Sequence, residues 1–183
     1  MSPCFIFFGL YMLIPLVIGF CLLGPGRWLV LNIAQCENPE QYDWVYEVSR
    51  KKMNRTHDSF DFGLKLDRIF NSSYAVQIDV YQKVDGGFKY HNTIRNECAC
   101  ALFMKYAEQN MIRGLMQANV DPPDCPIQPG DITLKDFVMD YKELPKLGVY
   151  GTFQTNLYLL YEGIKYFCIQ VILNFDLHDS DWF

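Results

Sequence analysis

The chain has 183 residues, of which 50% are hydrophobic and 20% are charged, and its net charge is −5 at pH 7. This length fits one domain, and the hydrophobic fraction excludes a disordered chain. Sixteen lysines and arginines are too few for the basic surface that nucleic acids require, so we expect no nucleic-acid partner. Aromatic residues make up 16% of the chain, which is enough for a sizeable core or a lined cavity.

The first charged residue is Arg27, which follows an apolar run over residues 5–23 and the tripeptide Gly24-Pro25-Gly26. An uncharged apolar stretch that ends in small residues is typical of a secretory signal peptide. With the two glycines at the −3 and −1 positions, we expect a signal peptide at 1–26 and a single mature domain at 27–183. Ala34 offers a second cleavage site. The alternative is an uncleaved anchor, because the run approaches the ~20 residues that span a bilayer.

Two Asn-x-Ser/Thr sequons agree with a secreted, extracellular chain. They are Asn54-Arg55-Thr56 and Asn71-Ser72-Ser73. Such sites receive glycans on the surfaces of secreted proteins. We therefore expect a glycoprotein that carries sugar at Asn54 or Asn71 and begins between Arg27 and Gln35.

The cysteine count predicts a disulfide framework. Removal of residues 1–26 takes Cys4 and Cys21 from the seven cysteines and leaves Cys36, Cys98, Cys100, Cys125 and Cys168. Five cysteines in a secreted domain predict two disulfides and one free thiol. The Cys-x-Cys pair lacks the spacing of redox and zinc sites. A bridge from Cys125 to Cys98 or Cys100 would close a loop of roughly 25–27 residues and stabilise the fold by roughly 3.5 kcal/mol.

Alternation of apolar and polar residues predicts strands in the first half of the chain. Positive-φ residues in Asp85-Gly86-Gly87 predict a tight hairpin between two of them. Together these segments suggest an antiparallel meander over residues 41–49, 60–67, 74–81 and 88–94.

The middle of the chain has helical spacing, because apolar residues recur every three or four positions between 97 and 118. Asn96 is placed to cap this helix, Gly114 weakens its interior so that two short helices are an alternative, and Pro122 ends it. Strands are again expected over 132–141, 149–161 and 164–177. We predict a mostly β fold, an antiparallel sandwich or β-cup with an inserted helix.

Nothing in the sequence indicates catalysis. The chain has no Gly-x-Ser-x-Gly elbow and no His-Glu-x-x-His pair. His57-Asp58-Ser59 contains the residue types of a triad, but neighbours on a strand face opposite sides, so we interpret the three as surface polar residues. His178, Asp179 and Asp181 are more typical of a polar chain end than of a metal site. We expect no enzyme, no metal and no cofactor.

The apolar strand faces allow either a packed core or a cavity for an apolar small molecule. The residues expected to line a cavity lie on apolar alternates of the strands, with two helical residues near the mouth. They are Phe62, Leu64, Leu66, Ile78, Val80, Phe167, Ile169, Val171 and Leu173 on the strands, and Phe103 and Tyr106 on the helix. A register error of one residue would move the whole strand set to the other face.

The order and spacing of several motifs resemble one known family. Cys125-Pro126-Ile127-Gln128-Pro129-Gly130 before a strand looks like an element of lipid-recognition β-cup domains. Over residues 41–177 the chain is similar to the insect CheB chemosensory proteins, which resemble the ganglioside activator protein. The similarity rests on the signal peptide, Tyr-Asp-Trp-x-Tyr-Glu at 42–47, the Cys98-x-Cys100 pair, Leu-Gly-Val-Tyr-Gly-Thr-Phe at 147–153 and Cys168.

The resemblance implies a β-cup with a hydrophobic pocket for lipid-like molecules, in a protein secreted near taste or smell sensilla. It implies a role in detecting contact pheromones by presenting cuticular hydrocarbons to a receptor channel of a sensory neuron. It transfers no catalytic residue. The activator has more disulfides than this chain can form, and Cys168 is left to pair with Cys36 or with the spare member of the Cys98/Cys100 pair. The alternatives are an extracellular structural β-sandwich without a ligand and, third, an enzyme or a hydrolase accessory.

Overall fold

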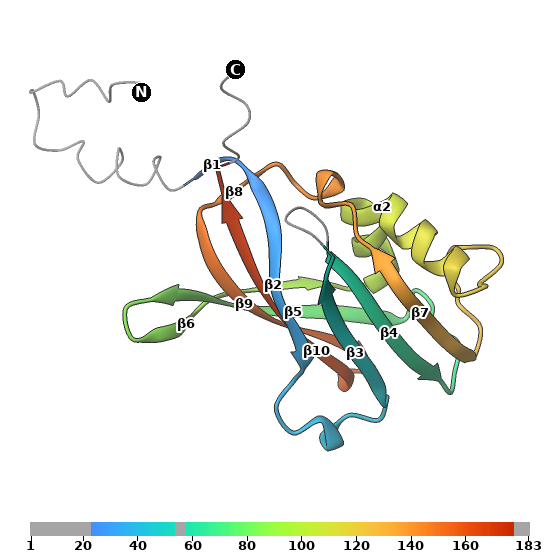
Figure 1. Cartoon of the computed structure of the whole chain (residues 1–183). Coiled ribbons are helices and arrows are strands. Elements are labelled where there is room, and N and C mark those ends of the chain that lie inside the picture. Colours follow the sequence, from blue (N-terminus) through green and yellow to red (C-terminus); the bar gives the residue numbers. More distant parts are fainter. Residues whose placement is uncertain (1–22, 54–57, 178–183) are drawn as a thin grey trace, which may run out of the picture.

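Two antiparallel sheets face each other in the computed structural model, which describes residues 23–53 and 58–177 (Figure 1). The larger sheet has five strands, in the order β2 (Arg27–Gln35), β10 (Ile164–Asp176), β9 (Gly151–Tyr161), β5 (Tyr74–Val84) and β6 (Gly87–Asn96). The smaller has three, in the order β3 (Tyr46–Lys52), β4 (Asp58–Leu66) and β7 (Gly130–Val138). The predicted mostly β fold with an inserted helix is confirmed.

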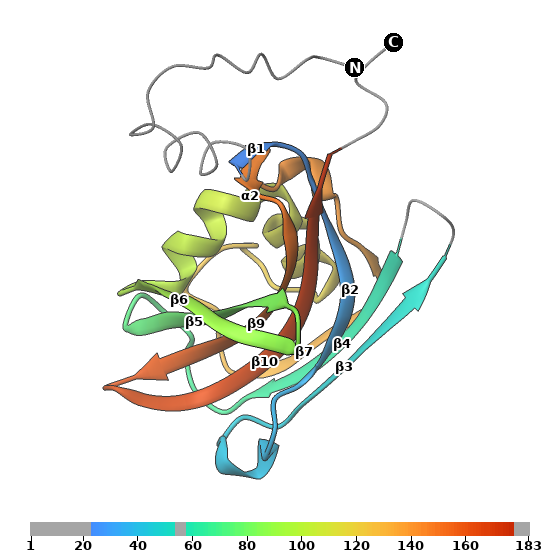
Figure 2. The ribbon, with the colours of Figure 1, turned by 90° about the vertical axis from the view of Figure 1, so that its left-hand side faces the viewer.

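The remaining elements are short, apart from one helix. Strands β1 (Leu23–Pro25) and β8 (Leu147–Val149) form a small two-stranded sheet. Helix α2 (Ala99–Gln117) lies beside β7 (Figure 1). In the five-stranded sheet, the long strands β2, β9 and β10 curve strongly (Figure 2). Two short 3-10 helices are η1 (Pro39–Gln41) and η2 (Tyr141–Glu143).

The predicted meander is wrong, although most of its strands exist. Strand β2 was not expected at all, and it pairs with β10 at the far end of the chain. Strand β4 pairs with β3 and β7, whereas β5 passes into the other sheet. Alternation reports which face of a strand is apolar but not which strand lies beside it. The strand expected from residue 41 begins only at Tyr46, after η1.

The start and the break of α2 both differ from expectation. Asn96 does not cap the helix, because its Oδ1 accepts from the N–H of Cys98, and Cys98 is the N-cap residue whose Sγ accepts from the N–H of Ala101. The helix breaks at Ala107, where φ is −151° and ψ is 39°, and not at Gly114. Gly114 stays helical because it is buried against the smaller sheet, where a small residue fits.

Both disulfides tie distant segments together. Cys100 at the start of α2 is bonded to Cys125 with a Cα–Cα distance of 6.4 Å, which confirms one of the two expected pairings. Cys36 after β2 is bonded to Cys168 in β10, with a Cα–Cα distance of 5.7 Å. Among the described cysteines, Cys98 is the free thiol. Because disulfides persist in oxidising compartments, the two bonds indicate an extracellular environment.

We predict that non-reducing peptide mapping recovers the pairs Cys100–Cys125 and Cys36–Cys168, with Cys98 alkylated. The double variant Cys100→Ala/Cys125→Ala should lose about 3.5 kcal/mol of unfolding free energy, since it releases a loop of 25 residues. Cys98→Ser is the control and should change stability little, because serine is a good N-cap. A Cys98–Cys125 peptide as the main product would contradict this pairing.

Tyr46 lies between the two sheets. Only 3% of Tyr46 is exposed, its ring centroid lies 4.5 Å from that of Phe167, and its hydroxyl donates to the carbonyl of Cys168. Burial raises the pKa of Tyr46 to about 12. The phenol therefore stays protonated in the folded protein at pH values where an exposed tyrosine is charged.

This raised pKa predicts a loss of stability at alkaline pH. In the unfolded chain Tyr46 releases its proton near pH 10, but in the folded chain only near pH 12, so the free energy of unfolding should fall as the pH rises through this window. The fall should be smaller in Tyr46→Phe. Urea unfolding at about pH 9 and about pH 11, on a Cys98→Ser background that prevents thiol exchange, measures it. An equal fall in both proteins would contradict the assignment to Tyr46.

Candidate ligand cavity

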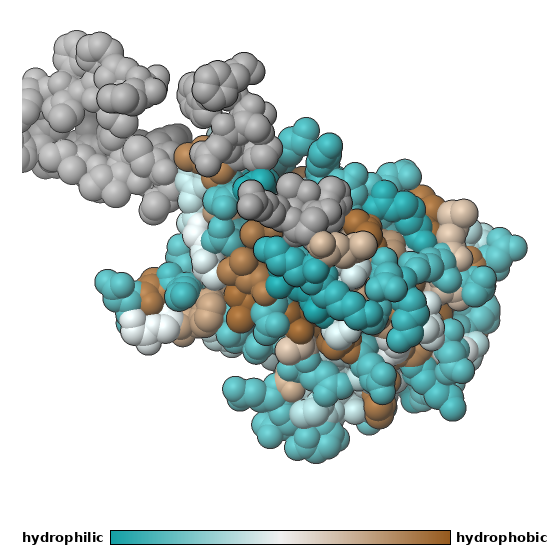
Figure 3. Space-filling model, viewed as in Figure 1, coloured by the Kyte–Doolittle hydropathy of each residue, from teal (hydrophilic) through white to brown (hydrophobic). Residues whose placement is uncertain are grey.

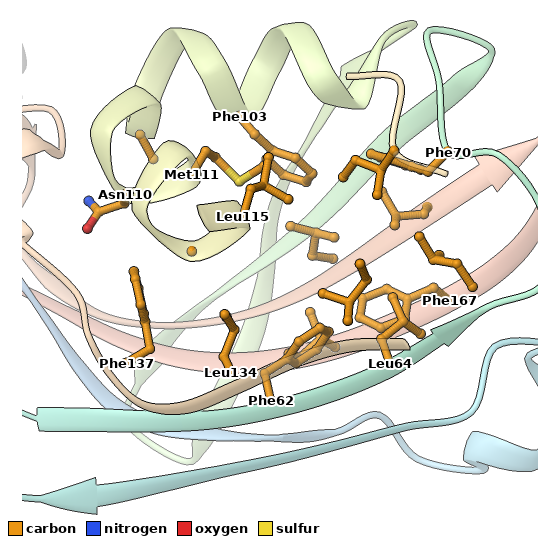
Figure 4. A pocket seen from close by; sticks show the side chains of 18 of the residues that line it. Phe62, Leu64, Phe70, Phe103, Asn110, Met111, Leu115, Leu134, Phe137 and Phe167 are labelled. Atoms are coloured by element: carbon orange, nitrogen blue, oxygen red, sulfur yellow. The ribbon is translucent and has the colours of Figure 1, made fainter. Parts of the chain in front are cut away.

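An apolar cavity of about 370 Å³ lies between the two sheets and beneath α2 (Figure 4). Side chains from β4, β7, β9, β10 and both halves of α2 form its wall. They are Trp44, Phe62, Leu64, Leu66, Phe70, Phe103, Ala107, Asn110, Met111, Gly114, Leu115, Ile127, Ile132, Leu134, Phe137, Met139, Leu157, Leu159, Phe167 and Ile169. Pockets of about 300–1,000 Å³ with mostly apolar walls are typical of sites for small molecules.

The cavity has a closed end and a more open end. At the closed end Trp44, Phe70 and Phe167 are each at most 5% exposed. At the other end Phe137 and Met139 are only half-buried, and Figure 4 shows Phe137 far from Phe70 along the cavity. A ligand that enters from the half-buried end would therefore meet a sealed aromatic wall at its far end.

A bulge in β7 directs two apolar side chains into the cavity. Leu134 pairs with Phe62 and Phe137 pairs with Phe60, so β7 has one residue more than β4 at this point. The bulge contains Asp136, which has a φ of 50°. The N–H of Asp136 donates to Asp61 Oδ1 at 2.8 Å. Strict alternation would put Leu134 and Phe137 on opposite faces, but the bulge brings both to the inner face.

The break at Ala107 determines which face of α2 lines the cavity. Before it, Phe103 points inward, and after it Met111 and Leu115 do. A β-carbon on Gly114 would lie 3.8 Å from Leu134 and from Phe137, which is ordinary contact. Gly114 therefore widens the cavity without being needed for an unusual backbone conformation.

The polar side chains of the wall are already hydrogen-bonded. Asn110 Nδ2 donates to the carbonyl of Asp140 at 2.9 Å, and its Oδ1 accepts from the N–H of Asp140 at 2.8 Å and from Arg113 at 2.6 Å. Figure 4 shows this amide turned away from the other lining side chains. The indole of Trp44 donates to Asp67 at 2.9 Å. The lining side chains therefore favour the hydrocarbon part of a ligand.

A buried ion pair lies on the same inner face, beyond Phe60. Asp58 is 4% exposed and accepts from Arg50 at 2.9 Å, and Arg50 also donates to the carbonyl of Leu31 in β2. Ser59 is 1% exposed. The interpretation of Asp58 and Ser59 as surface residues is wrong, because both are buried, and His57 lies outside the described residues.

Six of the eleven predicted cavity residues line the cavity: Phe62, Leu64, Leu66, Phe103, Phe167 and Ile169. The prediction was wrong for Ile78, Val80, Tyr106, Val171 and Leu173, which do not line it. The cavity covers the cross-strand rows Leu159–Phe167 and Leu157–Ile169. Val171 lies one row beyond these and Leu173 lies two rows beyond. Val80 is in the same row as Val171, because both pair with Thr155.

The other two misplaced residues have separate causes. Ile78 pairs with Leu157 of β9, but it lies on β5, one strand farther from the smaller sheet. At that position Ile78 packs against the core. Tyr106 immediately precedes the helix break and is 43% exposed, with the ammonium of Lys105 5.1 Å from its ring centroid. Strand alternation reports the face but not the position along it, and helical spacing fails across a break.

The missed lining residues come mainly from β7, β9 and the second half of α2. The alternation of Ile132 with Leu134 and of Leu157 with Leu159 is visible in the sequence and was a usable signal. No comparable pattern indicated Phe70 or Ile127, which the pairing of two irregular segments brings together.

Other predicted features occupy the periphery. Asn71 lies in the turn before β5, where its Oδ1 accepts from the N–H of Ser73 at 3.0 Å, whereas Asn54 and residues 1–22 lie outside the described ranges. Within residues 23–53 and 58–177, no helix is long and apolar enough to cross a bilayer, and no three metal-binding side chains gather. The face in Figure 3 is mainly hydrophilic, with a group of apolar side chains beside β2.

Comparison with protein-family models and with curated proteins finds no match to this chain.

We predict that Asn110→Ala destabilises the protein by about 1–3 kcal/mol, because the half-buried N–H and carbonyl of Asp140 lose their partner. Asn110→Asp keeps the acceptor but replaces the donor, so it should also destabilise. Urea unfolding measures both, with the exposed Gln109→Ala as the matched control on the same helix. An unchanged unfolding midpoint in Asn110→Ala would show that the amide does not hold this segment.

Proposed function

We propose that this protein is a secreted carrier that binds an apolar small molecule between its two sheets. The observation that carries the proposal is the cavity of about 370 Å³, which is sealed by aromatic residues at one end and has an apolar wall. Protein interiors are otherwise close-packed, with few voids larger than water. A space of this size beside well-packed residues such as Tyr74 and Val76, each 1% exposed, is better explained by a ligand than by loose packing.

The ligand that fits best is a hydrocarbon or the hydrocarbon part of a lipid. Asn110 and Trp44, the polar side chains of the wall, direct their donors and acceptors to protein groups. A hydroxyl or carboxylate forced among the apolar residues would lose its bonds to water without replacement, which costs several kcal/mol. Any polar end of the ligand therefore belongs at the half-buried end, near Met139.

The chemosensory role is supported by the resemblance to the insect CheB proteins. On this proposal the ligand is a lipid-like or cuticular-hydrocarbon pheromone, and the protein presents it to a receptor channel of a sensory neuron. The two disulfides fit an extracellular site of action. Glycosylation at Asn71, in an exposed turn, fits the same compartment.

The alternative is an extracellular structural β-sandwich with no ligand. It is favoured by the dense aromatic cluster around Trp44, where the ring centroid of Tyr74 lies 5.2 Å from the indole and that of Phe70 6.2 Å. The two proposals differ in what a larger side chain at position 114 does. If the space is filled by neighbouring side chains in solution, added atoms overpack it.

The deciding experiment replaces Gly114 by leucine and measures binding of the apolar fluorophore N-phenyl-1-naphthylamine together with urea unfolding. We expect wild-type protein to bind the probe and Gly114→Leu to bind at least tenfold more weakly, because the leucine occupies the cavity. The unfolding free energy should stay the same or rise, since glycine is costly inside a helix by about 1 kcal/mol.

Two matched variants accompany it. Gly114→Ala adds a single methyl group in ordinary contact and should keep probe binding. Gly63→Leu makes the same exchange on β4, where a β-carbon meets nothing within 4 Å, and should keep binding as well. A wild-type protein that binds no probe, with Gly114→Leu destabilised by about 1–3 kcal/mol, would support the structural sandwich instead.

A further inference from the structure

The residues just before Arg27 are built into the fold. Strand β1 pairs with β8 in antiparallel register, with Leu23 opposite Val149 and Pro25 opposite Leu147. The N–H of Gly26 donates to the carbonyl of Lys146 at 2.9 Å, and the hydroxyl of Tyr150 donates to the carbonyl of Pro25 at 2.8 Å. Every residue from 23 to 26 thus takes part in strand pairing or in a hydrogen bond to the 146–150 segment.

The two glycines of this segment are positions of close packing. A β-carbon on Gly24 would collide with the ring and hydroxyl of Tyr150. One on Gly26 would collide with the backbone carbonyl of Asp176 and lie 2.9 Å from the ring of Phe175. The carbonyl of Asp176 is backbone, so it cannot move aside as the end of a flexible side chain can. The small residues that look like a cleavage signal in the sequence are therefore also required by the packing.

The segment covers an aromatic cluster near the end of β10. Phe175 is 1% exposed, and its ring centroid lies 4.7 Å from that of Trp28 and 5.6 Å from that of Tyr150. Cleavage before Arg27 would remove the contact of Gly26 with Phe175, the acceptor of the Tyr150 hydroxyl and the pairing partner of β8. A cut at that bond would leave a mature protein with an exposed aromatic cluster and unpaired backbone groups.

We propose that the signal peptide is cleaved upstream of Leu23, at the bond between Cys21 and Leu22, and that Leu23–Gly26 remains in the mature protein. Gly19 and Cys21 supply the small residues at the −3 and −1 positions of this bond. The inference rests on the proposed secretion, and it moves the processing site from the glycine pair before Arg27 to one inside the apolar run.

The test is Gly26→Ala in the chain expressed with its own leader in insect cells, read by intact mass after glycan removal and by thermal unfolding. Alanine keeps a small residue at position 26, so it permits cleavage before Arg27 as well as glycine does. If residues 23–26 remain, the secreted variant is heavier than wild type by one methylene group and its Tm is lower, because the added methyl collides with Asp176. The wild-type mass then begins at Leu22.

Two other outcomes have distinct meanings. A variant identical to wild type in mass and Tm, with a sequence that begins at Arg27 or later, would overturn this inference and leave secretion intact. A protein that keeps residues 1–26 and stays with the cell membrane would overturn the proposed secretion itself. Gly63→Ala is the control, because it adds the same mass under every processing scheme at a position with open space around it.

Discussion

Trp44 joins the two sheets at the closed end of the cup. Its backbone N–H donates to the carbonyl of Tyr166 in β10 at 3.0 Å, and its indole donates to Asp67, just after β4, at 2.9 Å. Its ring also packs against Tyr74 and Phe70. Trp44 thereby contacts both sheets, and Tyr46, whose hydroxyl donates to the carbonyl of Cys168, adds a second link between them. Trp44 also lines the cavity that lies between the two sheets.

The helix covers that space because it is held independently at each end. Cys100 bonds to Cys125 at the N-terminal end, and Ile127 pairs with Phe70 through two backbone hydrogen bonds of 2.9 Å. Beyond the break, Asn110 is hydrogen-bonded to the segment that contains η2, and at the C-terminal end Gln117 donates to the carbonyl of Lys135. These contacts bring apolar side chains of α2 over the cavity without filling it. Packing at the periphery thus keeps the centre open.

Most of the strands, the hairpin at Gly86-Gly87 and a bridge from Cys125 to either Cys98 or Cys100 could be predicted from local patterns. The pairing of β2 with β10 could not be predicted, because it joins residues more than a hundred positions apart. The sequence of neither strand indicates which strand lies beside it. The cavity was predicted on the correct face for Phe62 and Ile169 but extended too far, to Leu173. The extent of the cavity depends on the curvature of the sheets and on the bulge at Asp136. The alternation of apolar and polar residues predicts neither of these features. The buried pair of Arg50 and Asp58 was missed because sequence alone does not show that β2 covers it.

The break in α2 at Ala107 divides the helix into two segments. A continuous helix transmits a displacement along its whole length as a stiff rod, but a residue with φ of −151° interrupts the hydrogen-bond ladder and acts as a joint. The first segment is fixed by a disulfide, whereas the second is held by noncovalent contacts, among them hydrogen bonds to Asp140, Glu143 and the carbonyl of Lys135. The part of the wall nearest the half-buried end is thus held by noncovalent contacts, whereas the part over the sealed end belongs to a segment that a disulfide fixes.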